Sequence, residues 1–267
     1  MKKKPRISVI IGIYNCASTL AEALDSMYAQ TYQDFKLILC DDGSKDNTFE
    51  VAAEYAEKHD NILLIKNSYN KGLNATLNHC LEHADTEFVA RMDGDDRSLP
   101  HRFEKEVKFL DEHPEYAIVS GPMHYFDEQG VFMKGKGKGI VTKQDFIAGT
   151  PFCHAPCMVR KEAYDKVDGY TVDPKLLRVE DYHLWFKMYA AGYKGYMLEE
   201  PIYEMRDSRD AVARRTFKSR LNEAYVKYIG YKMIGLPWWT QVYCLVPIIK
   251  GLIPNKVYKW LHKRIQH

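Results

Sequence analysis

The sequence lacks any apolar run as long as the roughly 18 residues that a membrane-spanning helix needs. Its formal net charge over 267 residues is only +2. The missing run argues against a membrane-spanning helix, and the balanced charge argues against nucleic acid as a partner, since nucleic-acid-binding proteins carry strongly basic surfaces. The basic start, MKKKPR, is followed by only eight residues of apolar character, so we expect a buried first strand rather than a secretory signal.

Two phosphate-binding patterns are also missing. No G-x-G-x-x-G follows the first apolar run, and no G-x-x-x-x-G-K-[ST] occurs. These absences argue against a dinucleotide-dependent oxidoreductase and a P-loop protein. A sugar-nucleotide pyrophosphorylase needs a glycine-rich loop where this chain has YNCAST, residues 14–19. Phosphate binding would therefore depend on a metal ion and on scattered basic groups.

Six cysteines are scattered through apolar stretches of the chain. Cys153 and Cys157 flank His154, but the spacing is not that of a zinc site and no second pair follows. We therefore expect buried free thiols in the reducing cytoplasm.

The first 125 residues contain a regular alternation of apolar runs with amphipathic segments. The runs that we interpret as strands are Ile7–Ile13, Phe35–Cys40, Ile62–Ile65, Phe88–Met92 and Ala117–Val119. The segments that we interpret as helices are Leu20–Ala29, Asn47–Lys58, Ala75–His83 and Arg102–His113, with Asn47 and Glu50 as a helix cap. This pattern predicts an α/β fold with a Rossmann-like, mostly parallel sheet that helices cover on both faces.

The regular alternation of apolar runs and amphipathic segments ends after Gly130. The segment KGKGKG, Lys134–Gly139, is typical of a flexible, solvated basic loop, and residues 140–205 have the pattern of mixed short strands and helices. From Arg214 onward the pattern is helical, then apolar and basic. We therefore expect one domain over residues 1–206 and a helical C-terminal extension over residues 207–267.

Polar clusters follow three of the predicted strands. They are Tyr14 with Asn15, the DDGS segment at Asp41–Ser44, and the RMDGDD segment at Arg91–Asp96. Ligands of open parallel sheets bind beyond the carboxyl ends of the strands. The three clusters therefore predict a binding site at one edge of the sheet.

The D-x-D spacing within RMDGDD predicts a metal site. In an extended chain Asp93 and Asp95 lie on one face and can share a hard cation, Mg²⁺ or Mn²⁺, together with a substrate phosphate. Asp96 would then point away, and Gly94 would allow a ligand to approach closely. A solvated acidic turn is the alternative, and the second acidic cluster, DDGS, argues against it.

Five segments carry a family resemblance: ISVIIGIYN, QTYQDFKLILCDDGSKDNT, NKGLNATLN, ARMDGDDRSLPHRFEKEV and RVEDYHLWFKM. Together they look like glycosyltransferase family 2, whose fold is GT-A. The similarity covers about residues 5–206. Each motif alone is weak, but the combination is specific.

The resemblance implies roles for the residues at the strand ends. Tyr14 would lie against the nucleotide base, and Asp42 would accept the ring N–H of that base, as expected for uracil. Asp93 would lie near the ribose and the metal, and Asp95 would ligate the metal that bridges the diphosphate. The stretch GIYN departs from the family, which usually has Pro or Thr before the Tyr-Asn pair, so Gly12 is expected to alter the nucleotide fit.

The pair ED at residues 180 and 181 matches the catalytic-base motif of the family, with Asp181 at the base position. Leu184, Trp185 and Met188 follow Asp181 at helical spacing, which predicts one apolar helix face that begins with Asp181. The helix N-terminus would favour the ionised carboxylate, and Glu180 would point elsewhere. A simple N-terminal cap remains the alternative.

Three residues are candidates on the acceptor or diphosphate side. His154, in PFCHAPCMVRKEA, matches a family position near the acceptor, and Arg206 follows PIYEM. Glu180 is the third. A structural histidine and an ordinary surface salt bridge of Arg206 are the alternatives.

These observations predict an inverting glycosyltransferase that depends on Mn²⁺ or Mg²⁺. The donor would be a nucleotide-diphosphate sugar, with UDP favoured, and the acceptor a hydroxyl of a glycan or lipid-linked molecule, as in cell-surface polysaccharide synthesis. A non-catalytic nucleotide-sugar-binding module of the same fold is the alternative. The sugar, the acceptor and the linkage depend on residues 125–180 and on loop shape.

The chain contains no Asp or Glu after Glu223. Residues 224–267 carry seven cations, namely Lys227, Lys232, Lys250, Lys256, Lys259, Lys263 and Arg264. The same stretch is rich in aromatic and aliphatic residues, which Pro247 and Lys250 are expected to interrupt. Such a mixture suits an anionic membrane surface, which predicts a peripheral protein on the inner face of the cell membrane. A helical flap packed on the main domain is the alternative.

Overall fold

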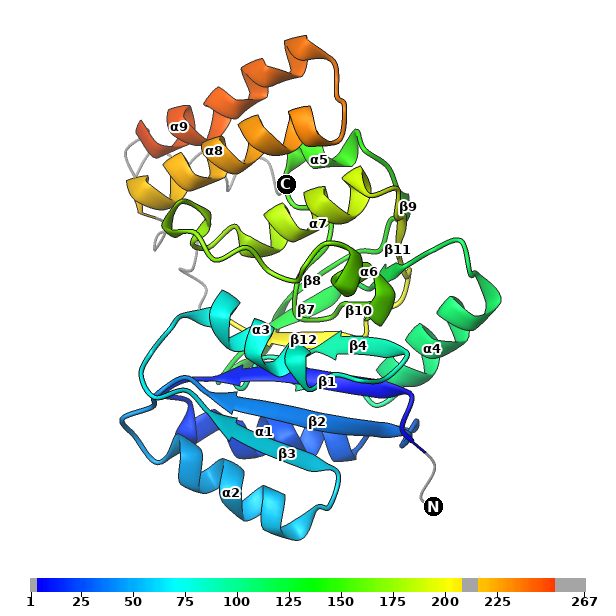
Figure 1. Cartoon of the computed structure of the whole chain (residues 1–267), viewed down its shortest axis with the longest axis vertical. Coiled ribbons are helices and arrows are strands. Elements are labelled where there is room, and N and C mark those ends of the chain that lie inside the picture. Colours follow the sequence, from blue (N-terminus) through cyan, green and yellow to red (C-terminus); the bar gives the residue numbers. More distant parts are fainter. Residues whose placement is uncertain (1–3, 208–215, 253–267) are drawn as a thin grey trace.

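The computed structural model describes residues 4–207 and 216–252 (Figure 1). Its larger sheet has eight strands in the order β3-β2-β1-β4-β10-β6-β11-β9. In that order they are Ile62–Lys66, Phe35–Asp41, Ile7–Ile13, Phe88–Arg91, Met158–Arg160, Ile118–Ser120, Gly195–Met197 and Gly139–Val141. Strands β3, β2, β1 and β4 pair in parallel, as do β6 and β11, whereas β10 and β9 are antiparallel to their neighbours. The predicted mostly parallel sheet is confirmed.

Helices cover both faces of this sheet (Figure 1). One face carries α1 Ala17–Tyr28, α2 Thr48–Lys58 and α4 Arg102–Glu112, and the other carries α3 Leu73–Glu82, α6 Lys161–Lys166 and α7 Glu180–Ala190. Successive side chains of β1 alternate between the two cores: Val9 and Ile11 face the first, and Ile10 faces the second. The near-continuous apolar sequence of β1 follows from this burial on both faces.

The first 125 residues fold nearly as their pattern predicts, with every predicted strand and helix present and shifted by at most three residues at an end. The predicted helix cap is confirmed in its position but not in its hydrogen bond. Asn47 occupies the N-cap position of α2 but its side chain makes no capping hydrogen bond. The backbone N–H of Thr48 instead donates to Asp46 Oδ1 at 3.1 Å.

A second sheet lies beside the first and has the order β5-β12-β7-β8. Its strands are Arg97–Ser98, Tyr203–Arg206, Met123–Asp127 and Gly130–Lys134. Strand β5 directly follows the RMDGDD segment and pairs antiparallel with β12. The second sheet thereby brings the end of β12 to the acidic turn.

The KGKGKG segment is not the freely solvated loop that we expected. A Cβ on Gly135 would lie 2.5 Å from the carbonyl oxygen of Met123, and one on Gly137 would lie 2.1 Å from that of Leu198. The glycines are therefore required by close backbone packing. Only the intervening lysines are exposed.

Residues 216–252 of the C-terminal extension pack on the α/β domain. Helix α8, Phe217–Met233, crosses α7 at Gly230, where an added Cβ would lie 2.2 Å from the ring of Phe186. The 3-10 helix η3, Trp238–Cys244, and α9, Leu245–Leu252, form an outer layer on α8 (Figure 1). Val226 and Tyr231 belong to the same core cluster as Trp185, so this part of the extension shares the core of the domain.

Helix α9 runs through Pro247 and Lys250, which interrupt the apolar run of this segment but not the helix. Pro247 is the third residue of the helix, where its missing N–H has no intrahelical partner to lose. Among the described residues no helix is both long and apolar enough to cross a bilayer. All six cysteines are free, as expected, but Cys16 and Cys153 are only partly buried.

Candidate active site

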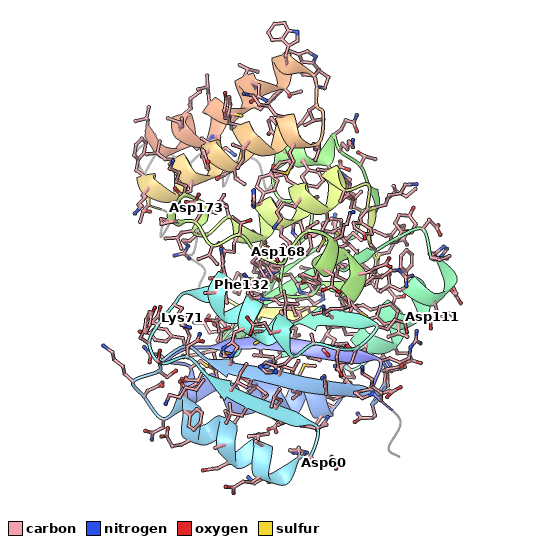
Figure 2. The ribbon with its side chains drawn as sticks, in the orientation of Figure 1. Asp60, Lys71, Asp111, Phe132, Asp168 and Asp173 are labelled. Atoms are coloured by element: carbon pink, nitrogen blue, oxygen red, sulfur yellow. The ribbon has the colours of Figure 1, made fainter. Side chains whose placement is uncertain are left out.

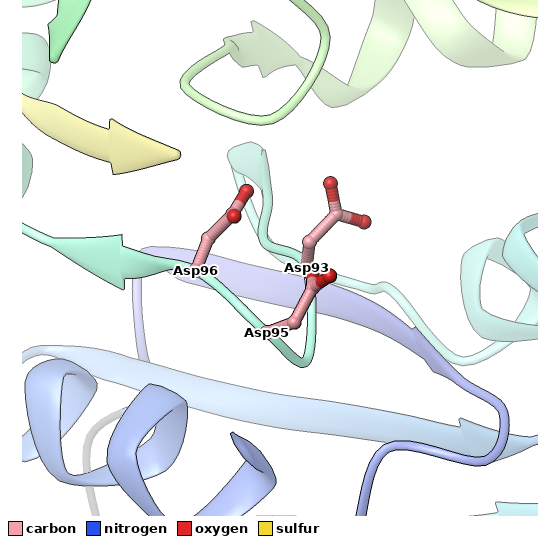
Figure 3. Close-up of side chains that lie close together, drawn as sticks. All are labelled: Asp93, Asp95 and Asp96. Carbon is pink, nitrogen blue, oxygen red and sulfur yellow. The ribbon is translucent and has the colours of Figure 1, made fainter. Parts of the chain in front are cut away.

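Three carboxylates meet directly beyond β4. Each of Asp93, Asp95 and Asp96 offers an oxygen, and these oxygens lie within 4.8 Å of one another (Figure 3). We expected Asp96 to point away, which is wrong, because the chain turns at Gly94 and Asp95 instead of running extended. Sequence reasoning assigned Asp96 no role, and only the turn brings it into the cluster.

Asp93 forms an ion pair with the buried Arg91. Both terminal nitrogens of the Arg91 guanidinium donate to the two oxygens of its carboxylate. The Arg91 side chain is only 5% exposed, whereas that of Asp93 is 26% exposed. The backbone N–H of Asp93 donates to the hydroxyl of Tyr203 at 3.2 Å. Asp93 is therefore held firmly, and its charge is partly neutralised before any ligand binds.

Asp95 and Asp96 lack such a partner. Asp95 is the most exposed residue of the three. Partial desolvation of its carboxyl group, and then the charge of the neighbouring Asp93, raise the pKa of that group. Asp96 is buried, and burial together with Asp93 and Asp95 raises its pKa strongly. One Asp96 oxygen accepts from the backbone N–H of Arg206 at 2.7 Å, while the other is buried without a partner among the described residues. The negative charges of these carboxylates repel one another, and a hard divalent cation bound between them would relieve the repulsion. Asp95 and Asp93 would hold the cation, with the unpartnered Asp96 oxygen nearby.

Gly94 has a different role from the one we expected. A Cβ at this position would lie 2.9 Å from Cys16 Sγ and 3.3 Å from Ile13 Cγ2. The glycine therefore allows the acidic turn to pack against the start of α1, rather than allowing a ligand to approach. The sequence carries no signal for this contact, because it depends on a cysteine in another element.

Arg206 closes one side of the acidic turn. Its Nε donates to the backbone carbonyl of Asp95 at 3.0 Å, and its guanidinium pairs with Glu22, which also pairs with Arg97. The ion pair that we kept as an alternative thus exists. Contact of Arg206 with a diphosphate stays a prediction.

Tyr14 and Asp42 lie at the neighbouring strand ends. Tyr14 is 43% exposed, and the backbone N–H of Asp42 donates to the carbonyl of the adjacent Ile13 at 2.9 Å. Gly12 faces α3 rather than a nucleotide: its Cβ would lie 3.2 Å from Thr76. The expected effect of Gly12 on the nucleotide fit is therefore not supported by its surroundings.

Asp181 lies in the first turn of α7, after the N-cap residue Val179. It is therefore not the simple cap that we considered. Burial, and then the neighbouring Glu180, raise its pKa to about 7, although the backbone N–H of Tyr182 and the charge of Arg91 act in the opposite direction. We expected the helix N-terminus to favour the ionised form, but desolvation outweighs that effect.

The predicted inward face of α7 is confirmed, since Leu184, Trp185 and Met188 are all fully buried. Glu180 does not simply point away. One of its carboxylate oxygens is buried without a partner among the described residues, and its charge acts on Asp181.

His154 packs against the same helix face. Its ring lies edge-on to Trp185, and its Nε2 is 2.7 Å from the hydroxyl of Tyr170. Burial and then Arg91 hold its pKa well below the usual range, so the imidazole is neutral. These contacts fit the structural interpretation of His154, and a contact with the acceptor stays a prediction.

A buried arginine joins the two halves of the site, and sequence reasoning missed it. Arg102 Nη2 donates to the backbone carbonyls of Arg91 at 2.9 Å, Ala155 at 3.2 Å and Cys157 at 3.3 Å. Its charge is balanced by the equally buried Glu106 at 3.0 Å. Arg102 therefore ties the end of β4 to the segment that carries His154.

The loops before α3 and α7 lie on the same side of the molecule. Figure 2 shows Lys71 and Asp173, one in each loop, on the same side of the view and away from Asp111 at the end of α4. The charge of Arg91 acts on both Asp95 and Asp181, so both carboxyl groups lie within its electrostatic reach. A mostly parallel sheet covered by helices on both faces, with an acidic turn directly beyond β4, is the arrangement expected of a glycosyltransferase of the GT-A fold.

The chain belongs to glycosyl transferase family 2, whose family model matches residues 8–168. It is 42% identical to the putative glycosyltransferase EpsE of Bacillus subtilis over 99% of this chain and 95% of that protein. It is also 26% identical to WfaP of Escherichia coli, a UDP-Glc:alpha-D-GlcNAc-diphosphoundecaprenol beta-1,3-glucosyltransferase, over 93% of this chain and 95% of that protein.

Solved structures share the fold at low sequence identity. TarS of S. aureus in complex with UDP-GlcNAc superposes with a TM-score of 0.71 at 20% identity, over 92% of this chain and 71% of that chain. The mannosyltransferase PcManGT of Pyrobaculum calidifontis, in complex with GDP-Man and Mn²⁺, gives a TM-score of 0.66 at 18% identity, over 99% of this chain and 81% of that chain.

Proposed function

We propose that this protein is an inverting, divalent-metal-dependent glycosyltransferase. It transfers a sugar from a UDP-sugar to a hydroxyl of a glycan or lipid-linked acceptor, as in cell-surface polysaccharide synthesis. The observation that carries the proposal is the acidic turn directly beyond β4, where three carboxylates offer oxygens to one cation. The buried carboxyl of Asp181, whose pKa is raised to about 7, supports it.

Asp181 is the proposed base. A carboxyl with a pKa near the working pH is poised to accept a proton. Asp181 takes the proton of the acceptor hydroxyl while the oxygen forms a bond to the anomeric carbon. The bond between that carbon and the diphosphate breaks at the same time, so the nucleotide diphosphate leaves without a covalent intermediate. When bound at Asp93 and Asp95, the cation supplies positive charge for the departing diphosphate.

The relatives support the substrate classes. WfaP is named for UDP-Glc and a diphosphoundecaprenol acceptor, and TarS is solved with UDP-GlcNAc. PcManGT is solved with GDP-Man and Mn²⁺, which supports a metal ion together with a nucleotide sugar.

A donor screen tests the proposed activity. The full chain is incubated with Mn²⁺ and a panel of UDP-, GDP- and CDP-sugars, and the released nucleotide diphosphate is measured. We expect release from at least one UDP-sugar, with or without an added acceptor. Tight nucleotide binding without release from any donor would favour the alternative, a non-catalytic nucleotide-sugar-binding module.

We further propose that the C-terminal extension binds an anionic membrane surface from the cytoplasmic side. Eleven of the nineteen exposed large apolar side chains among the described residues lie between Phe217 and Leu252. Trp238 is 85% exposed and Leu252 is 70% exposed, and the exposed Lys232 and Lys250 lie among these apolar groups. Lys227, which we counted with the cationic surface, is instead buried and donates to the carbonyl of Ile147. Lys256, Lys259, Lys263 and Arg264 lie outside the described residues.

Co-sedimentation with liposomes that contain anionic lipid tests the membrane proposal. The full chain is expected to sediment at low salt, and a chain that ends at Gly235 is expected to remain in the supernatant. Because truncation also removes the buried Cys244, the double variant Trp238→Asp, Ile249→Asp is a second test that leaves the core intact. Ile140→Asp, at an exposed position on β9, is the matched control. If full-length and truncated proteins both stay in the supernatant, the extension is structural.

A further inference from the structure

The carboxylate of Asp42 is nearly saturated with hydrogen bonds from its own chain. Its Oδ1 accepts from Asn67 Nδ2 at 2.9 Å and from the backbone N–H of Lys71 at 2.8 Å. Its Oδ2 accepts from the backbone N–H of Gly72 at 2.9 Å. A carboxylate oxygen offers about two lone-pair positions. Oδ1 is therefore filled, and Oδ2 keeps a single position for a ligand.

The orientation of the Asn67 side chain is forced by its partners. The amide is buried, and an ionised carboxylate can only accept, so the nitrogen end must face Asp42. The same nitrogen lies 3.1 Å from Thr76 Oγ1, and Thr76 in turn donates to the carbonyl of Gly72 at 3.0 Å. The oxygen end faces His79 Nδ1 at 3.0 Å, which requires His79 to carry a proton on that nitrogen. A flipped amide would lose the bond to Asp42, because its oxygen would then face an acceptor-only carboxylate.

Nucleotide bases differ in what they present to such a carboxylate. Uracil has one ring N–H between two carbonyl groups. Guanine has a ring N–H beside an amino group, and these two donors pair with both oxygens of a free carboxylate. Cytosine has an acceptor at the corresponding ring nitrogen, which a carboxylate repels. A carboxylate with one open position fits the single N–H of uracil and leaves the second guanine donor without a partner.

We propose that Asn67 is a positioning residue that blocks Asp42 Oδ1 and thereby selects uridine donors against guanosine donors. The inference rests on the proposed function and on the role that the family resemblance implies for Asp42, which is to accept a ring N–H of the base. The backbone N–H of Asp42 donates to the carbonyl of Ile13, so Asp42 lies at the end of β2 next to the strand end that carries the exposed Tyr14. Asn67 itself then needs no contact with the nucleotide, because it acts only through Asp42.

The variant Asn67→Ala opens Oδ1 and is the direct test. Affinities of the full chain for UDP, GDP and CDP are measured by calorimetry in the presence of Mn²⁺. A hydrogen bond to a charged group changes an equilibrium by about 10- to 100-fold. We expect the UDP-to-GDP affinity ratio to fall by about 10-fold or more in the variant, because guanine gains its second bond while the uracil contact loses its rigid partner.

Two further variants keep the test decisive. Asn67→Ser removes the same amide and serves if Asn67→Ala does not fold. Asn61→Ala is the matched control, because the half-buried Asn61 also makes two side-chain hydrogen bonds, to the carbonyl of Phe35 and from the hydroxyl of Tyr28, at the opposite ends of the strands. We expect Asn61→Ala to lower thermal stability but to leave the UDP-to-GDP ratio unchanged.

The outcomes separate the inference from the proposed function. A folded Asn67 variant that keeps the wild-type UDP-to-GDP ratio would overturn the positioning role and leave the glycosyltransferase proposal standing. A wild-type protein that binds GDP as tightly as UDP would overturn the base assignment of Asp42 and the inference with it. A selective fall in the ratio that Asn61→Ala does not reproduce supports the inference.

Discussion

Asp181→Asn is expected to lower turnover by at least ~10²-fold, the lower end of the contribution of a general base, while UDP affinity stays nearly unchanged. The asparagine keeps the shape and the hydrogen bond from the backbone of Tyr182 but cannot take up a proton from the acceptor. Steady-state kinetics of transfer and calorimetry with UDP and Mn²⁺ measure the two quantities. Turnover near that of the wild type would move the base to Glu180 or to another group.

The dependence of kcat/KM on pH in the wild-type protein also tests whether Asp181 is the base. Because Asp181 must be ionised to act and its pKa is raised to about 7, kcat/KM is expected to fall as the pH drops below about 7. This acidic limb is expected to disappear in the residual activity of Asp181→Asn. Asp165→Asn, which changes an exposed aspartate paired with Lys161, is the control that should leave the profile intact.

The same carboxyl links stability to pH. A raised pKa in the folded state means that folding is favoured when Asp181 is protonated, so its ionisation destabilises the protein increasingly between pH 4 and pH 7. The rise from 3.8 to about 7 corresponds to at most about 4 kcal/mol. Asp181→Asn is therefore expected to unfold at a higher temperature than the wild type at pH 8 and at a similar temperature at pH 4, as thermal denaturation at the two pH values will show.

Asp95→Ala is expected to abolish Mn²⁺-dependent UDP binding and, with it, turnover. Asp95 is the most exposed carboxylate of the acidic turn, and Arg91 does not neutralise it as it does Asp93. Removing Asp95 therefore removes the ligand that is most available to a cation. Calorimetric titration of UDP with Mn²⁺ and with a chelator gives the metal-dependent part of the affinity.

The Asp95→Ala experiment needs a control at a surface aspartate outside the acidic turn. Asp165→Ala removes an aspartate that pairs with Lys161 on the surface and should leave the metal dependence unchanged. If Asp95→Ala binds UDP with wild-type affinity and wild-type metal dependence, the cation is held elsewhere.

The elements of the first 125 residues, and helix α7 farther along the chain, were predictable because each has a clear local pattern. Strand β1 is apolar because it is buried on both faces, and α7 has apolar residues at helical spacing because one of its faces lies in the core. The acidic cluster was predicted from the D-x-D spacing together with the DDGS segment at the end of another strand, although the turn itself was not. Local periodicity was therefore sufficient to predict the elements whose buried positions repeat regularly along the sequence.

What the sequence did not predict depends on contacts between distant segments. Asp96 joins the acidic cluster through a turn, and it is tied to Arg206, 110 residues away in sequence. Asn67 reaches Asp42 across 25 residues, and Arg102 reaches Cys157 across 55 residues. The raised pKa of Asp181 likewise follows from burial by the whole fold, which outweighs the local effect of the helix terminus.

A crystal structure of the full chain with UDP and Mn²⁺ tests the central proposal most directly, because the anomalous signal of manganese locates the ion independently. We predict the ion on Asp95, in contact with the diphosphate, with the uracil ring N–H on Asp42 Oδ2 and the carboxyl of Asp181 facing the open side of the same site. UDP bound away from the acidic turn, or bound there without manganese, would contradict the proposal.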